Sequence, residues 1–186
     1  MKTVKTNDIP VDIYVRFVRS LFNDAIILIV GALCHSLIAL LVYQRTGALI
    51  YLALAVVMLG AGIYRYLGIK NFQAKGAITD YLSAVYWENY YLLGGTIQGF
   101  FLGMFCFVAI WWEPDTFGEI ASVSVAMGST MTIVGRNYGS KTMVAILSVT
   151  VVLPIAIGLM LRGDVNHVIL GLYIIPFMLI ITKMAK

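Results

Sequence analysis

Six long apolar runs are the feature of this sequence that most restricts its possible folds. Each run has close to the 20 apolar residues that a helix needs to cross the hydrocarbon core of a bilayer. Backbone polar groups in hydrocarbon must form hydrogen bonds within their own segment, so each run is predicted to be an α-helix. We therefore expect an all-α polytopic bundle of six transmembrane helices, at about residues 21–43, 47–68, 90–112, 118–137, 142–161 and 165–183.

The composition agrees with a membrane protein and excludes most other classes. Hydrophobic residues make up 61% of the chain and charged residues 12%, against about 45–50% and about 25% in soluble domains. Six crossings in 186 residues leave no room for a water-soluble domain of ordinary size. A net charge of +4, scattered along the chain, gives no indication of a nucleic-acid partner. The predicted partner is the lipid bilayer.

The chain divides into a short N-terminal segment and one membrane module. We assign residues 1–20 to a cytoplasmic segment and residues 21–186 to the six-helix module. Within the junction, residues 10–22 carry apolar side chains at helical spacing, which predicts a short helix with its apolar stripe in the membrane interface. A frayed extension of the first span is the alternative. The stripe consists of Ile13, Phe17 and Leu21.

Lysine and arginine positions predict the orientation of the bundle. With six spans, eleven of these residues fall on the side of the N-terminus and only Arg45 and Arg162 on the other. Connections rich in Lys and Arg stay in the cytoplasm, so both termini are predicted to be cytoplasmic. The eleven are Lys2, Lys5, Arg16, Arg19, Arg65, Lys70, Lys75, Arg136, Lys141, Lys183 and Lys186.

Glycines and prolines predict how the helices pack. Gly95, Gly99 and Gly103 recur every four residues and so share one face of the third predicted helix. Such a face lets another helix backbone approach closely, either within the chain or in a second protomer. Pro154 and Pro176 are predicted to kink the fifth and sixth spans.

Charged and strongly polar side chains near membrane depth are the candidate regulatory residues, because their burial in a bilayer is costly. Asp24, Glu88, Arg136 and Asn137 all lie near the predicted cytoplasmic ends of their helices. Two arrangements are open at this level: an ion-paired cluster of Asp24, Glu88 and Arg136 that seats three helix ends against one another, or separate interfacial side chains that face water. No charged residue occupies the middle of a predicted span, which argues against a proton relay or a coupled ion transporter.

Two histidines are the only residues that suggest a metal or haem. His35 lies inside the first predicted span and His167 begins the sixth. Paired imidazoles can ligate haem or copper, but no carboxylate or second histidine stands at ligand spacing. A buried histidine bonded to a neighbouring helix is favoured, and we expect no metal and no cofactor. Signatures of soluble enzymes are also missing, so no catalytic site is expected.

Part of the chain resembles a known family. The block from Trp87 onward is similar to the N-terminal membrane modules of bacterial cyclic-di-GMP signalling proteins, especially those of alphaproteobacteria. The likeness covers about half of the chain, and its most specific element is the inner-side segment 135–140. The residues that carry it are Trp87, Glu88, Asn89, Tyr91, Gly94, Gly95, Gly135, Arg136, Asn137, Tyr138, Gly139, Ser140, Pro154 and Pro176.

The resemblance implies a function for the module. In that family a six-helix sensor precedes a GGDEF domain, often followed by an EAL domain, so the whole proteins are diguanylate cyclases or cyclic-di-GMP phosphodiesterases. This chain contains neither sequence. We expect a dimeric sensory module in the bacterial inner membrane, whose last helix continues past Lys186 into a cytoplasmic output domain. A small self-contained transporter or channel is the alternative.

Overall fold

The computed structural model describes residues 10–76 and 78–184. These residues form seven α-helices, one π-helical turn and no strand. Six of the helices, α2 to α7, are long and apolar enough to cross a membrane, so the predicted all-α fold with six helices of membrane length is confirmed. The elements are α1 (Val11–Leu21), α2 (Ala25–Thr46), α3 (Leu49–Ala74), α4 (Tyr81–Phe107), η1 (Val108–Trp112), α5 (Thr116–Arg136), α6 (Lys141–Arg162) and α7 (Val165–Met184).

Several helices extend beyond the apolar runs that predicted them. Helix α3 continues to Ala74, past the expected end at residue 68, and α4 begins at Tyr81 instead of residue 90. Hydropathy marks the apolar part of a helix, whereas backbone hydrogen bonding continues until a cap ends it. The cap of α4 is Asp80, whose carboxylate accepts a hydrogen bond from the Ser83 amide at 2.9 Å.

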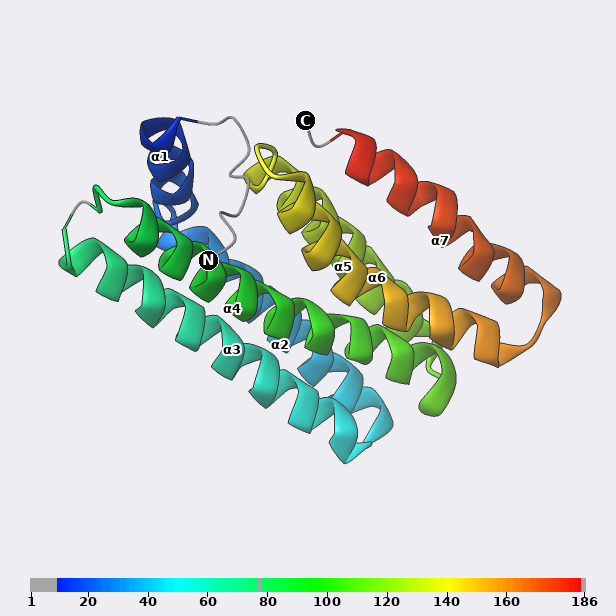
Figure 1. Ribbon diagram of the computed structural model, residues 1–186. Helices are drawn as coiled ribbons and strands as arrows, with labels where there is room; N and C mark the ends of the chain where they lie inside the picture. Colours follow the sequence, from blue (N-terminus) through cyan, green and yellow to red (C-terminus); the bar gives the residue numbers. More distant parts are fainter. Residues whose placement is uncertain (1–9, 77, 185–186) are drawn as a thin grey trace, which may run out of the picture.

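The six long helices run alternately up and down, with α4 and α6 at the centre of the bundle (Figure 1). Helix α7 packs mainly along α6 and leaves most of its surface uncovered. We use "α1 end" for the end of the bundle where α1 lies. The C-terminal part of α7 is also at the α1 end, because Ile181 packs against Val144 in the first turn of α6.

Helix α1 crosses the end of the bundle and packs against it (Figure 1). Val15, Val18 and Leu21 are buried in one cluster with Phe72 and Trp87. The predicted helix is therefore present, but the face that it buries differs from the predicted stripe. Of that stripe only Leu21 is buried, whereas Phe17 is partly covered and Ile13 is exposed. The aromatic rings of Trp87 and Tyr91 on α4 belong to the same cluster and form the apolar surface on which α1 packs. Residues 1–9 of the predicted cytoplasmic segment lie outside the described residues.

The glycine face of α4 packs against α6 of the same chain. A Cβ atom at Gly99 would stand 2.8 Å from Thr150 Oγ1, and one at Gly103 would stand 2.6 Å from the carbonyl oxygen of Val151. Glycine is required at both positions because the two helices are this close. Helix α6 is continuous through Pro154, whose ring lies against Gly103, and α7 is continuous through Pro176.

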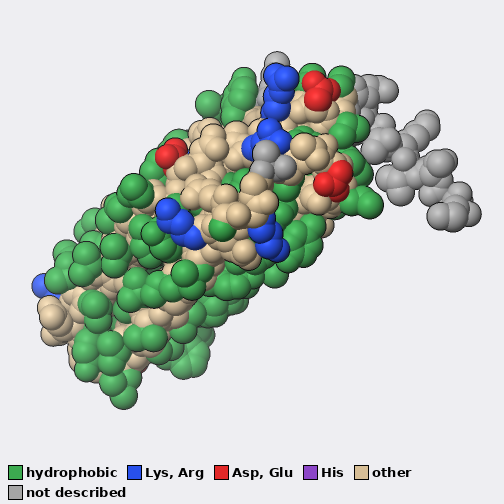
Figure 2. Space-filling model, turned by 90° about the vertical axis from the view of Figure 1, so that its left-hand side faces the viewer, with side chains coloured by type: hydrophobic (Ala, Val, Ile, Leu, Met, Phe, Trp, Pro, Cys, Tyr) green, Lys and Arg blue, Asp and Glu red, His purple; other side chains and the backbone are tan. Residues whose placement is uncertain are grey.

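The surface separates into an apolar belt and a charged end. Figure 2 shows most of the visible charged side chains gathered at one end, with hydrophobic side chains covering the flanks. Large apolar side chains on α2 and α7 are exposed along the length of both helices. A bilayer is the solvent in which such flanks are stable.

Candidate functional site

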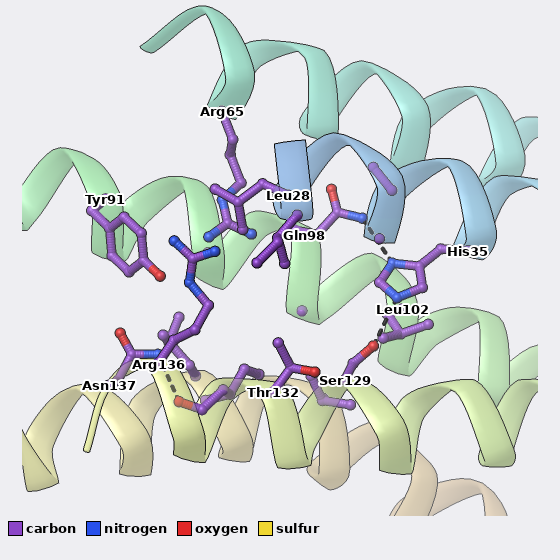
Figure 3. Close-up of a pocket in the computed structure, with 18 of the residues that line it drawn as sticks. Leu28, His35, Arg65, Tyr91, Gln98, Leu102, Ser129, Thr132, Arg136 and Asn137 are labelled. Atoms are coloured by element: carbon purple, nitrogen blue, oxygen red, sulfur yellow. Dashed lines mark hydrogen bonds between the residues drawn. The ribbon is translucent and has the colours of Figure 1, made fainter. Parts of the chain in front are cut away.

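A cavity of about 290 Å³ lies inside the bundle, between α2, α4, α5 and α6 and below the side chain of Arg65 from α3. Figure 3 shows polar side chains of α2, α3, α4 and α5 converging on it. Its apolar wall includes Leu28, Leu102, Leu147 and Val151. Its polar lining consists of His35, Arg65, Tyr91, Gln98, Ser129, Thr132, Arg136 and Asn137.

His35 closes one side of the cavity through a hydrogen-bonded chain across three helices. The Gln98 amide nitrogen lies 3.2 Å from Nδ1, and Nε2 lies 2.7 Å from the Ser129 hydroxyl oxygen. An amide nitrogen can only donate, so Nδ1 is the acceptor and Nε2 carries the proton. The imidazole is thus a neutral bridge between α2, α4 and α5, the arrangement that the sequence favoured over a metal ligand.

Two arginines point into the cavity from opposite walls, Arg65 from α3 and Arg136 from α5 (Figure 3). The Arg65 guanidinium carbon lies 5.3 Å from the centre of the Tyr91 ring. Among residues 10–76 and 78–184, no carboxylate forms an ion pair with either arginine. The cavity therefore holds two positive charges with no acidic partner in the described part of the chain.

Two buried acceptors add to this polar lining. The side chains of Gln98 and Asn137 are only 6% and 1% exposed. Neither Gln98 Oε1 nor Asn137 Oδ1 receives a hydrogen bond from any described residue. Most buried polar atoms in proteins have a partner, so the cavity offers unused acceptors beside its guanidinium donors.

The predicted ion-paired cluster of Asp24, Glu88 and Arg136 does not form. Arg136 instead donates to the backbone carbonyl oxygens of Leu21, at 3.0 Å, and Asp24, at 3.4 Å. Leu21 is the last residue of α1, and the carbonyls of a helix C-terminus lack partners within the helix and carry partial negative charge. Arg136 is thus bonded to the junction of α1 and α2.

Glu88 is engaged by α1 and not by Arg136. Its carboxylate accepts a hydrogen bond from the Tyr14 hydroxyl. Partial burial and the nearby carboxylate raise the pKa of Tyr14, so its proton is retained and the bond persists at neutral pH. Glu88 therefore contributes to holding α1 on α4, separately from the cavity.

The other predicted residues are divided between the cavity and the rest of the bundle. Gly95 and Gly99 line the cavity on α4, and Asn137 lines it at the end of α5. Gly103, Pro154 and Pro176 lie outside its lining.

His167 lies far along the fold, at the start of α7, where its Nε2 is 3.1 Å from Glu119. Arg162 contacts the same carboxylate at 3.2 Å. The structure does not bring His167 together with His35. Within the described part of the chain, no group of three potential metal ligands is present.

Sequence reasoning missed Arg65, Tyr91 as a cavity residue, Gln98 and Ser129. Arg65 was counted as a connection residue because it stands near the end of the predicted span, whereas α3 continues nine residues beyond it. Gln98 was visible as the strongly polar residue within the glycine pattern. A polar side chain inside an apolar run is by default a functional candidate, and that signal could have identified both.

Comparisons with protein-family models, with curated proteins and with solved structures find no match to this chain. What the cavity can do therefore has to be inferred from its residues and their geometry.

Proposed function

We propose that this chain is a membrane-embedded sensory and regulatory module. The observation that carries the proposal is the double position of Arg136, which lines the cavity and also donates hydrogen bonds to the carbonyl oxygens of Leu21, at the end of α1, and Asp24, just before α2. A ligand that draws the guanidinium into the cavity competes with those carbonyls. Occupation of the cavity then changes how firmly α1 is held, which gives the two states that a regulatory module needs.

The packing of α1 supports a movable element at this position. Helix α1 is short and is held by Val15, Val18 and Leu21 on one side and by the Tyr14 and Arg136 hydrogen bonds. Gly139, just after α5, stands where a side chain would meet the Phe17 ring, so α1 also touches the α5–α6 turn. A shift of α1 therefore changes the packing of α4 and of the turn that leads into α6.

The resemblance to cyclic-di-GMP signalling proteins suggests which output domain the module would regulate. On this reading the module is a homodimer in the bacterial inner membrane, with both termini cytoplasmic, and transmits its state to a GGDEF or EAL domain. The chain itself performs no catalysis. The segment 135–140, which carries the most specific likeness, contains Arg136 and Asn137 of the cavity.

Arg136→Ala tests the proposed function through its output. In membranes from cells that express the complete gene, it is expected to shift cyclic-di-GMP synthesis or hydrolysis severalfold without reducing membrane insertion, because the Leu21 carbonyl at the end of α1 loses its bonded cation. Arg45→Ala is the matched control, since Arg45 lies at the opposite end of the bundle. Equal cyclic-di-GMP turnover by wild type, Arg136→Ala and a gene lacking residues 1–186 would show that the module serves only as a membrane anchor.

The orientation makes a separate prediction. Reporter fusions at residues 44–46, 113–116 and 162–166 are expected to be extracytoplasmic, and fusions near 72 and 139 cytoplasmic. The reason is the eleven-to-two distribution of Lys and Arg between the two sides. The measurement is the paired activity of a periplasm-active and a cytoplasm-active reporter at each site. A cytoplasmic result at 113–116 would contradict the six-span topology.

A further inference from the structure

We propose that the cavity binds an anionic amphiphile, with its carboxylate or phosphate group between Arg65 and Arg136 and its apolar tail passing between α2 and α5 into the bilayer. This inference rests on the proposed function, because it supplies the chemical class of the signal. A fatty acid and an anionic phospholipid share this chemistry, so both are considered as sources.

The charge of the cavity selects an anion. Two guanidinium groups face one space, and the described residues pair neither with a carboxylate. Unpaired cations within a membrane are costly, and arginine forks fit the oxygens of carboxylates and phosphates with two parallel hydrogen bonds. One bound anion neutralises both arginines at once. No arrangement of the cavity's own side chains does so.

The mouth of the cavity indicates where a tail leaves. Ile27 and Val30 on α2 line the cavity and yet are 48% and 49% exposed, and Thr132 on α5 is also exposed. Gly31, which follows Val30 on α2 and also lines the cavity, has no heavy atom within 4 Å of the position a Cβ would take. The opening therefore lies on the apolar flank, between α2 and α5, where lipid chains and not water surround the protein.

The size of the cavity excludes complete enclosure of a lipid. About 290 Å³ is at the lower limit of ligand pockets, which usually range from about 300 to about 1,000 Å³. That volume accommodates a head group and the first few carbons of a chain. The rest of the tail has to remain in the membrane, as the lateral opening allows. The free acceptors Gln98 Oε1 and Asn137 Oδ1 can in addition bind hydroxyl groups of a head group.

The test is ligand-dependent thermal stability of the full chain in an uncharged detergent. Palmitate and dioleoyl phosphatidylglycerol are titrated, with hexadecanol and dioleoylglycerol as uncharged counterparts. A ligand that binds only the folded state raises the melting temperature with concentration. We expect an increase with at least one anionic amphiphile and little with the uncharged pair. Stabilisation by palmitate alone would identify a fatty acid as the ligand, and stabilisation by phosphatidylglycerol alone would identify a phospholipid. Equal stabilisation by both would show that the anionic group itself is recognised.

Variants locate the binding. Arg65→Gln is expected to weaken binding by about tenfold or more, because a charge-assisted hydrogen-bonding partner is lost. Gly31→Leu is expected to block the mouth, whereas Gly60→Leu on α3 is the matched control, because its Cβ also has no neighbour within 4 Å and it lies outside the lining. Melting temperatures without ligand verify that each variant folds.

Two results would overturn the inference: equal stabilisation by charged and uncharged amphiphiles, or wild-type binding by both Arg65→Gln and Gly31→Leu. The binding assay needs no signalling output, so the two proposals fail separately. Absent binding with an output that still responds to Arg136→Ala rejects only the ligand class. Binding without any effect of the cavity variants on output rejects only the sensory function.

Discussion

Gly103→Leu is expected to produce the largest loss of stability of any substitution on α4. A Cβ atom there would lie 2.6 Å from the Val151 carbonyl oxygen and 2.9 Å from the Thr150 carbonyl oxygen. Backbone atoms cannot rotate away as a side chain can, so α4 and α6 have to separate. Overpacking of this kind costs about 1–3 kcal/mol and occasionally more, and we expect the upper part of that range.

The measurement is thermal unfolding in detergent, with Gly128→Leu as the matched control. Gly128 is also a helical glycine, on α5, but a Cβ there has no heavy atom within 4 Å. Its substitution is expected to change the melting temperature little. Similar melting temperatures for Gly103→Leu and wild type would mean that α4 and α6 are farther apart than described.

Arg65→Met is expected to have the second largest effect, and in the opposite direction. Replacing Arg65 by methionine keeps the apolar stem that packs against Gly94 and removes a charge with no acidic partner among the described residues. Replacement of buried ion pairs by apolar groups of similar volume is often neutral or stabilising, by about 1–4 kcal/mol, and the same desolvation cost is relieved when a partly buried cation without an acidic partner is removed. The ligand-free protein is therefore expected to melt at a higher temperature.

Arg45→Met provides the comparison for this stabilisation. Arg45 forms an ion pair with Asp115 at 3.7 Å and its side chain is largely exposed. Exposed pairs contribute little, so this variant is expected to melt close to wild type. A lower melting temperature for Arg65→Met would show that Arg65 stabilises the fold. Its presence in the cavity would then no longer indicate a binding site that costs the protein stability.

The fold was predictable from the sequence because each helix satisfies its own backbone hydrogen bonds. The apolar runs predicted six membrane-length helices, and the four-residue spacing of Gly95, Gly99 and Gly103 predicted a close helix contact. The partner of that contact was left open, because spacing describes one helix face and says nothing of what lies opposite. The structure places α6 of the same chain there.

The candidate site was less predictable, since it depends on how far helices extend and how they are rotated. Arg136 and Asn137 were singled out as costly polar residues, but the partner of Arg136 was expected to be a carboxylate. The backbone carbonyls of Leu21 and Asp24 take that place, and a backbone acceptor has no signature in sequence. Arg65 was assigned to a connection because hydropathy underestimates the length of α3.

The one-sided attachment of α7 has a mechanical consequence. This helix lies against α6 along a single seam, in which Gly171 stands where a Cβ would be 3.3 Å from the Ala156 carbonyl oxygen. A rotation of α7 about that seam repacks one interface, whereas any comparable movement of α4 disturbs contacts with six other elements. Helix α4 is therefore fixed by its many neighbours, whereas α7 can move relative to the bundle through its contact with α6. Because Ile181 packs against Val144 at the α1 end, a tilt of the first turn of α6 is passed directly to the last turns of α7.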